Sequence, residues 1–181
     1  MPGVVTRYVA LLRGINVNGI TITMSSLHDL FTGLGFTGVK TVLASGNVLF
    51  ETGPGEKDAP ALKARIEAAL SEAYGYEAWI VLLGVDTLAR IVSAYPFDPS
   101  REGWHPYVVF SSDASAVAEL LAGADGLDPH DERVTAGDRV LYWEVRRAVG
   151  VKSPFSKLSG KARYRSSTTT RNLRTLHKLV D

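Results

Sequence analysis

The spacing of apolar residues predicts a strand, helix, strand, strand, helix, strand order in the first half of the chain. Residues 5–12 alternate and then run apolar, as in a strand, whereas Leu27, Phe31 and Leu34 recur at helical spacing. Two β-rich segments meet at Ser45-Gly46, where a glycine suits a hairpin turn. The expected strands are residues 5–12, 38–44, 47–51 and 77–83, and the expected helices are residues 24–34 and 56–74.

The same order begins again after a segment rich in proline. A short helix is expected over residues 86–94, and residues 96–106 then hold three prolines and a glycine, which is typical of a boundary. The strand, helix and hairpin that follow are expected at residues 107–110, 114–121 and 133–145.

Two similar sequence segments support an internal duplication. Ala-Ser-Gly-Asn-Val-Leu-Phe-Glu at residues 44–51 resembles Thr-Ala-Gly-Asp-Arg-Val-Leu-Tyr-Trp-Glu at residues 135–144, so Gly46 and Gly137 are expected at equivalent turns. The C-terminal part departs from the repeat, with expected helices over residues 153–158 and 171–180. Only residues 163–166 are left there to form a fourth strand. We predict an α+β fold of two ferredoxin-like, βαββαβ-type halves, residues 1–98 and 99–181, with a helical C-terminus.

The composition and the distribution of charge narrow the class of protein. The 181-residue chain is 45% hydrophobic, holds no cysteine and contains no apolar run of membrane-spanning length. We therefore expect a soluble cytoplasmic protein with no membrane partner and no thiol chemistry. The net charge of +1 hides an asymmetry, because residues 146–181 hold ten Lys and Arg against one acid. Such a basic tail suits a phosphate-bearing ligand or nucleic acid, although it could equally dock on the acidic remainder of the chain.

Polar residues of the first half are expected to meet at one rim of its sheet. In a ferredoxin-like unit the first and third strands are antiparallel neighbours, so the end of one lies beside the start of the other. Arginine, asparagine and serine there offer several hydrogen-bond donors to a ligand. Alternatively, Arg13 and Asn47 only satisfy carbonyl groups of the loop over residues 16–23. The predicted rim residues are Arg13, Asn16, Ser45 and Asn47.

A second candidate anion site lies in the basic tail. Thr168 to Thr170 precede the expected helix over residues 171–180, so one threonine is expected to cap it and its free amide N–H groups can meet an anion. Capping alone also explains the threonines, but not the number of cations nearby. The predicted ligand-binding residues here are Lys152, Lys157, Thr169, Thr170, Arg171 and Asn172.

Three further motifs follow one another along the chain: Leu-Arg-Gly-Ile-Asn at residues 12–16, Ser-Gly-Asn-Val-Leu-Phe at residues 45–50, and Thr-Thr-Arg-Asn at residues 169–172. In this order they resemble the motifs of the bacterial domain of unknown function 1697 family. The resemblance spans almost the whole chain and implies two ferredoxin-like α+β halves. The family has no settled activity, so the resemblance implies no reaction.

Other motifs lie in a structural context that does not fit their usual function, and we expect no metal and no cofactor. Residues 33–38 match the dinucleotide pattern G-x-G-x-x-G, but they follow a helix and precede a strand, which reverses the order that a pyrophosphate site needs. The four histidines show no metal-ligand spacing. An RNA-binding sheet would need aromatic residues on its central strands, and Tyr8 and Phe50 are the main ones there, with Phe50 expected in the core.

These observations favour a binding protein for a phosphate-bearing small molecule or nucleic acid, using the sheet rim and the basic tail. The alternatives are an enzyme of unidentified reaction, with Arg13 and Arg171 holding an oxyanion or phosphate, and a protein-interaction module. No nucleophile or general base stands out, and the sequence indicates no particular oligomeric state.

Overall fold

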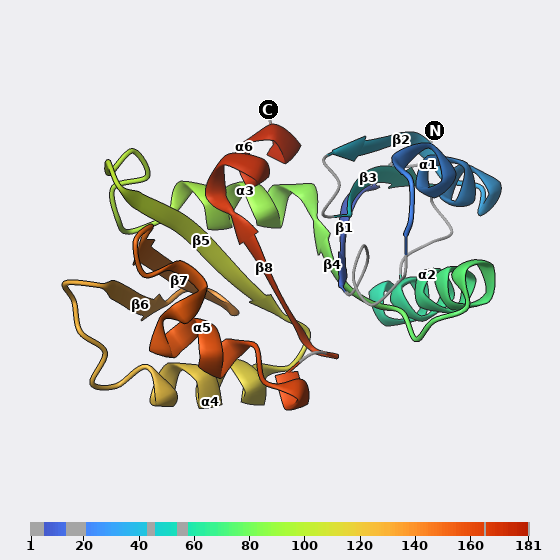
Figure 1. The fold of residues 1–181 in the computed structure, drawn as a ribbon. Coiled ribbons are helices and arrows are strands. Elements are labelled where there is room, and N and C mark those ends of the chain that lie inside the picture. The colour runs from blue at the N-terminus through green and yellow to red at the C-terminus, as the bar shows by residue number, and fades with distance from the viewer. Residues whose placement is uncertain (1–5, 14–20, 43–45, 54–57, 165, 181) are drawn as a thin grey trace. The chain divides into compact units, whose positions relative to one another are not determined.

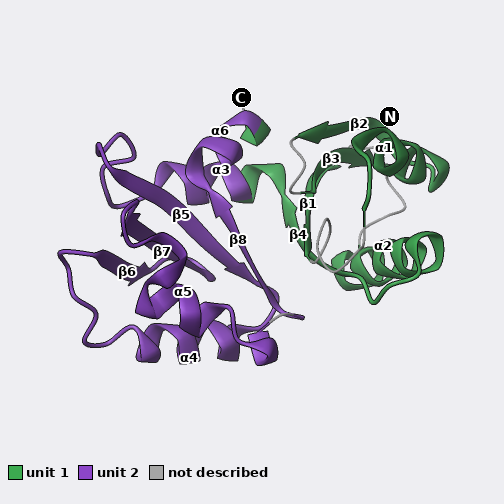
Figure 2. Cartoon of the chain, viewed as in Figure 1, with its two compact units in different colours: residues 1–87, 179–181 green, residues 88–178 purple. Residues whose placement is uncertain are grey.

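The computed structural model describes residues 6–13, 21–42, 46–53, 58–164 and 166–180 (Figure 1). The chain forms two compact units, residues 1–87 with 179–181, and residues 88–178 (Figure 2). The prediction had divided the chain at residues 98 and 99, after the short helix rather than within it. No helix in the described ranges is long and apolar enough to cross a membrane.

The first unit contains the four strands and two helices expected of a ferredoxin-like half. All strand neighbours are antiparallel, in the order β2-β3-β1-β4. The elements are β1 (Thr6–Arg13), α1 (Met24–Gly33), β2 (Thr37–Val42), β3 (Asn47–Thr52), α2 (Ala59–Tyr74) and β4 (Trp79–Gly84).

The core of the first unit lies between the sheet and its two helices. Phe31 of α1 and Phe50 of β3 are almost fully buried, and their ring centroids lie 5.3 Å apart. Tyr8 stacks on Phe50 with its centroid at 5.8 Å. Phe50 is therefore a core residue, as expected, and the Tyr8 ring points to the same, helix-covered side of the sheet.

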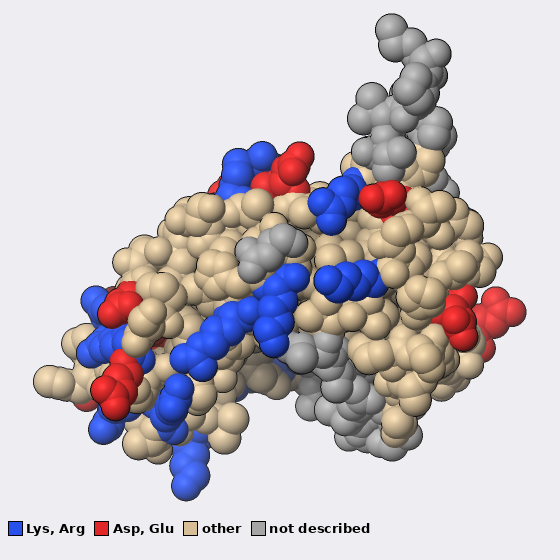
Figure 3. Space-filling view, turned by 90° about the horizontal axis from the view of Figure 1, so that it is seen from above, with Lys and Arg blue, Asp and Glu red and all other residues tan. Residues whose placement is uncertain are grey.

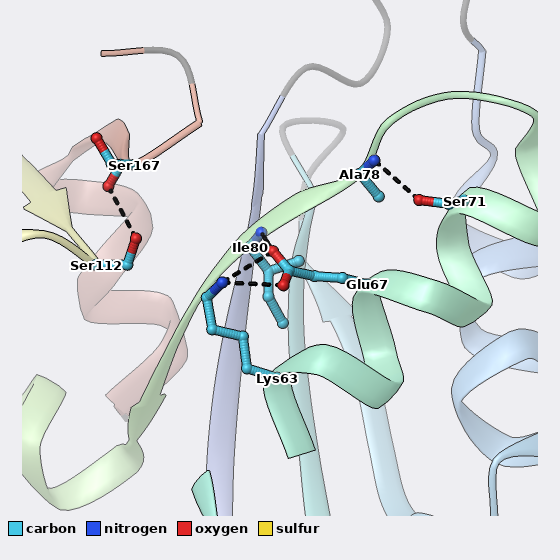
Figure 4. Close-up of polar contacts among 7 residues, drawn as sticks. All are labelled: Lys63, Glu67, Ser71, Ala78, Ile80, Ser112 and Ser167. Atoms are coloured by element: carbon cyan, nitrogen blue, oxygen red, sulfur yellow. Dashed lines mark hydrogen bonds and ion pairs between the residues drawn. The ribbon is translucent and has the colours of Figure 1, made fainter. Parts of the chain in front are cut away.

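Helix α2 shields the outer edge of β4 (Figure 4). Glu67 Oε2 accepts the backbone N–H of Ile80 at 3.0 Å, and Ser71 Oγ accepts that of Ala78 at 3.0 Å. Lys63 Nζ donates to Glu67 Oε1 at 2.9 Å and so holds this carboxylate in place. Unpaired N–H groups on an edge strand invite pairing with another chain, and these side chains satisfy that of Ile80 within β4 and that of Ala78 directly before it.

The second unit has the same strand order, β6-β7-β5-β8, with antiparallel neighbours throughout. Its 3₁₀ turns η1 (Gly150–Lys152) and η2 (Ala162–Tyr164) flank α5. Its other elements are β5 (Trp104–Ser111), α4 (Ala114–Gly123), β6 (Glu132–Ala136), β7 (Val140–Arg146), α5 (Pro154–Ser159) and β8 (Thr168–Asn172). The helices α3 (Val85–Ser93) and α6 (Leu173–Val180) each have residues in both units and lie mostly in the second.

Helices cover both faces of the second sheet. Val109, Leu141 and Trp143 pack with Leu120 of α4 and Phe155 of α5 on one face. On the other face, the hydroxyl of Tyr142 donates to the carbonyl of Ile91 in α3 at 2.7 Å. A flat aromatic platform for bases is therefore missing from the described residues of this sheet.

The structure corrects the prediction for the C-terminal segment. Thr168 to Asn172, expected as the cap and first residues of a helix, form the fourth strand β8. Residues 163–166 were expected as that strand, but the first two of them belong to the 3₁₀ turn Ala162–Tyr164. The helix α6 begins only at Leu173, and Asn172 Oδ1 accepts the N–H of Arg174 at 2.9 Å. Three consecutive β-branched threonines favour the extended backbone over a helix.

The strand registers show that the two halves are similar. Tyr8 of β1 faces Phe50 of β3, and Tyr107 of β5 faces Trp143 of β7 in the matching place. Gly137 lies in the β6–β7 connection and donates its N–H to the carbonyl of Val140 at 2.9 Å. The prediction that Gly46 and Gly137 are equivalent is wrong by two residues, because Gly46 directly precedes β3 as Arg139 directly precedes β7. These two residues also share a positive φ, of 83° and 62°.

Each half also ends in an amphipathic helix that follows its last strand directly. Helix α3 begins after Gly84 and buries Val85, Leu88 and Ile91, while α6 begins after Asn172. The buried residues of α6 repeat the same spacing and are Leu173, Leu176 and Leu179.

Candidate functional site

The structure places the described rim residues of the first sheet at neighbouring strand ends. Leu11 of β1 faces Asn47 of β3, and the N–H of Leu12 donates to the carbonyl of Gly46 at 2.9 Å. Arg13 ends β1 and Asn47 begins β3 at this same end of the ladder. Two further predicted residues, Asn16 and Ser45, lie outside the described residues.

Asn47 has a role in the fold. Its side chain is fully buried, and Nδ2 donates to the carbonyl of Val42 at 2.8 Å. This bond ties the end of β2 to the start of β3. Asn47 thus satisfies a backbone carbonyl, as the alternative interpretation held, although the carbonyl belongs to β2 and not to the loop after β1.

Arg171 and its neighbouring threonines lie within the second sheet. Arg171 is only 6% exposed, and its Nη1 donates to Thr169 Oγ1 at 2.5 Å and to the carbonyl of Thr170 at 3.2 Å. Thr168 Oγ1 donates to the carbonyl of Tyr164 at 2.8 Å. Because Thr168 to Thr170 form a strand, they cannot present the helix N-terminus on which the predicted anion site depended.

The basic tail is only partly neutralised by the rest of the chain. Arg146 pairs with Asp131 at 2.5 Å and Arg163 with Glu119 at 3.8 Å. The predicted ligand-binding residues Lys152, at the end of η1, and Lys157, on α5, are exposed and form no ion pair within the described ranges.

Sequence reasoning missed a basic cluster at the end of the second sheet where β5 begins and β7 and β8 end. The N–H of Arg147 donates to the carbonyl of Gly103 at 2.8 Å, which continues the β5–β7 ladder beyond its last strand pair. Tyr107, two residues after His105, faces Asn172 of β8, which caps the helix carrying Arg174. We call His105, Tyr107, Arg147, Asn172 and Arg174 the basic edge.

The electrostatics of the basic edge are those of crowded cations. Burial lowers the pKa of His105, and the neighbouring charges of Arg147 and Arg174 lower it further. Both arginines are exposed, and their guanidinium groups have no carboxylate partner among the residues that the structure describes. His105 is therefore neutral near pH 7 and can share a proton with a ligand, while the two arginines can bind an anion.

Only the topology brings these residues together. His105, Arg147 and Arg174 are widely separated in the sequence. The prediction placed residues 168–170 at a helix start and residues 171–180 in that helix, so it lacked the strand β8 that connects them. Asn172 is the one predicted site residue that belongs to the basic edge.

The family model for "Protein of unknown function (DUF1697)" matches residues 5–142. The chain belongs to this family. A solved structure, described as that of the conserved bacterial protein SP0830 from Streptococcus pneumoniae, is 26% identical to this chain with a TM-score of 0.79, and the match covers 98% of both chains. An unknown protein from Galdieria sulphuraria is 11% identical with a TM-score of 0.27, covering 93% of this chain and 97% of that one. No curated protein matches the chain.

Membership in DUF1697 agrees with the resemblance in the sequence, but it implies no particular reaction. The chemistry of the site therefore depends on the side chains of this chain. In the described ranges, no three His, Asp or Glu side chains gather as metal ligands. The basic edge offers cationic and neutral donors, which suit anion binding.

Proposed function

We propose that this DUF1697 protein binds a phosphate-bearing ligand at the basic edge of its second unit. The observation that supports this proposal best is that the charges of Arg147 and Arg174 both act on His105 at this end of the sheet, while neither guanidinium group has a carboxylate partner among the described residues. A bound phosphate would offset both positive charges.

Further exposed cations add to the positive potential of the second unit. Figure 3 looks onto the side where α6 lies and shows Lys and Arg side chains in a band with few Asp or Glu among them. Lys178 on α6 and Lys152 after β7 are further exposed cations of the same unit. Such a field attracts anions and accelerates their association at low salt.

We expect the phosphate of the ligand to contribute more to binding than its base. Tyr8, Phe50, Tyr107 and Trp143 form aromatic pairs within the two cores, so the described central strands present no aromatic stacking surface. We therefore propose recognition through phosphate oxygens, whether they belong to a nucleotide or to a nucleic-acid backbone. A cytoplasmic location is part of this proposal and is supported by the absence of cysteine.

Titration of fluorescent nucleotides and labelled oligonucleotides at two salt concentrations tests the proposal and distinguishes the two sources of phosphate. Binding of either class should weaken as salt rises, and an oligonucleotide that contacts several phosphates should show the steeper dependence. Arg147→Gln and Arg174→Gln should each weaken binding by roughly tenfold, the scale of one charge-assisted hydrogen bond.

Lys40→Gln is the matched control, because Lys40 is an exposed cation on β2 of the first unit. It should leave the affinity nearly unchanged. Failure of both ligand classes to bind at low salt, or equal losses in all three variants, would contradict the proposal.

A further inference from the structure

A buried carboxylate on β7 holds two arginine side chains in place. Glu144 is 1% exposed, and its Oε2 accepts Nη1 of Arg101 at 3.0 Å, Nε of Arg133 at 2.7 Å and Nη2 of Arg133 at 2.5 Å. Oε1 of Glu144 is also buried and has no hydrogen-bond partner among the described residues. Arg133 directly faces Glu144 in the β6–β7 ladder, so the sheet itself sets this geometry.

Aromatic rings support both guanidinium groups. Cζ of Arg101 lies 3.7 Å from the centroid of the Trp104 ring, and Cζ of Arg133 lies 4.7 Å from that of Phe97. The carboxylate and the rings together restrain the two cations before any ligand arrives. Their side chains nevertheless remain 40% and 48% exposed, so donors are left for a ligand.

The two arginines line an open pocket of about 500 Å³ together with Asp98 and Pro129. This volume suits a small organic molecule. Oδ1 of Asp98 accepts the N–H of Ser100 at 2.9 Å, and its other carboxylate oxygen has no partner among the described residues. The wall thus offers guanidinium donors and a carboxylate acceptor in one small pocket.

The charges favour a zwitterion over a simple anion. Arg101 and Arg133 are balanced by Glu144 and Asp98, so the four groups carry no net charge. A phosphate dianion would meet the arginines but would also be repelled by Asp98. We propose that this pocket binds a free α-amino acid, whose carboxylate contacts Arg101 and Arg133 and whose ammonium group contacts Asp98. The pocket shares no lining residue with the basic edge, and the inference does not depend on the proposed function.

Calorimetric titration of the full chain with a panel of free L-amino acids tests this inference. At least one amino acid should bind saturably at millimolar concentration. Its N-acetyl derivative, which lacks the ammonium group, and its amide, which lacks the carboxylate, should each bind roughly tenfold more weakly. Absence of saturable binding by every free amino acid would overturn the inference, as would equal affinity for a free amino acid and both of its derivatives.

Two variants separate the contributions of the pocket. Asp98→Asn retains an acceptor for Ser100 and should remove the preference for the free amino acid over its N-acetyl derivative. Arg101→Gln leaves Arg133 on Glu144 and should weaken binding of both roughly tenfold. If Arg101→Gln does not fold, the Asp98→Asn variant still tests the pocket, because Asp98 is exposed.

Matched controls are Asp125→Asn and Arg163→Gln, which alter exposed residues of the same unit outside the pocket. Neither should change amino-acid affinity, and Arg147→Gln at the basic edge should not change it either. Binding that is insensitive to both pocket variants, or that falls equally in the controls, would show that the arginines and Glu144 form only a structural ion-pair cluster.

Discussion

Asn47 is fully buried, and its amide ties the start of β3 to the carbonyl of Val42. Asn47→Ala leaves that carbonyl without its donor, so we expect a loss of about 1–3 kcal/mol in the free energy of unfolding. Urea denaturation measures this loss. A variant of unchanged stability that has lost affinity for phosphate ligands would instead show that Asn47 is a binding residue.

Glu132 is another buried carboxylate that supports the fold of the second unit. It is 1% exposed, accepts Trp143 Nε1 at 3.1 Å, and accepts the N–H of Phe155 in the first turn of α5 at 3.3 Å. Glu132→Gln should cost about 1–3 kcal/mol in unfolding free energy, because an amide provides only one accepting oxygen for these two donors. Glu102→Gln, at an exposed position of the same unit, is the control for denaturant melts and should be nearly neutral. Equal stability of the two variants would contradict this role.

The lowered pKa of His105 predicts how the free energy of unfolding changes with pH. The folded protein binds a proton at His105 less readily than the unfolded chain, whose histidines titrate near pH 6.5. The neutral imidazole therefore contributes stability above about pH 6.5, and this contribution is lost as pH falls through the lower folded value. His105→Gln should flatten the decline in unfolding free energy below that pH, measured by urea melts at several pH values. An unchanged pH profile would show that His105 titrates normally.

At the scale of single residues, the sequence singled out polar positions but could not separate ligand-binding roles from structural ones. Asn47 and Arg171 were candidates because their side chains offer donors, and both are buried in the structure with those donors bonded to the chain itself. Burial depends on packing across the sheet, which a local pattern does not report. His105 and Arg174 carried no local motif, and only strand pairing brings them to one edge.

At the scale of elements, the shielded edge of β4 makes a testable pair of variants. Glu67→Ala removes the acceptor of Ile80 N–H and should lower the unfolding free energy by about 1–2 kcal/mol. Lys63→Ala removes only a partly exposed ion-pair partner and should cost less than about 1 kcal/mol. Denaturant melts of both variants measure the difference, and a larger loss for Lys63→Ala would show that the ion pair, not the edge bond, stabilises this region.

The elements of the first unit could be predicted because periodicity and turn residues agree there. Phe31 and Leu27 mark a helix, and the apolar alternation of β1 marks a strand. Strand β8 was missed because its five residues include three threonines and two polar residues, with no apolar alternation to signal a buried strand. Thr169 and Arg171 are buried by the surrounding structure although the local pattern is polar.

At the scale of the whole chain, the duplication could be predicted from the similar segments at residues 44–51 and 135–144. The structure shows that the similarity of the two halves includes other strands and a helix. The Tyr8–Phe50 and Tyr107–Trp143 pairs occupy matching registers, and α3 and α6 follow equivalent strands. The charge asymmetry led to the prediction of anion binding by the basic tail, but charge counts alone single out no particular residues. The topology brings Arg147 and Arg174, which have no carboxylate partner among the described residues, to the end of the sheet where β5 begins and β7 and β8 end, and the proposed function rests on this edge.

The most direct test of that proposal is the pKa of His105 itself, followed by NMR titration of its imidazole with and without a nucleoside triphosphate. In the free protein this pKa should lie below the ordinary value, because of burial and of Arg147 and Arg174. A phosphate bound at the basic edge should raise it, and binding should accordingly tighten as pH falls through this range. Arg174→Gln should raise the pKa of the free protein and reduce the shift caused by the ligand. A His105 titration that is identical with and without saturating ligand would contradict phosphate binding at this edge.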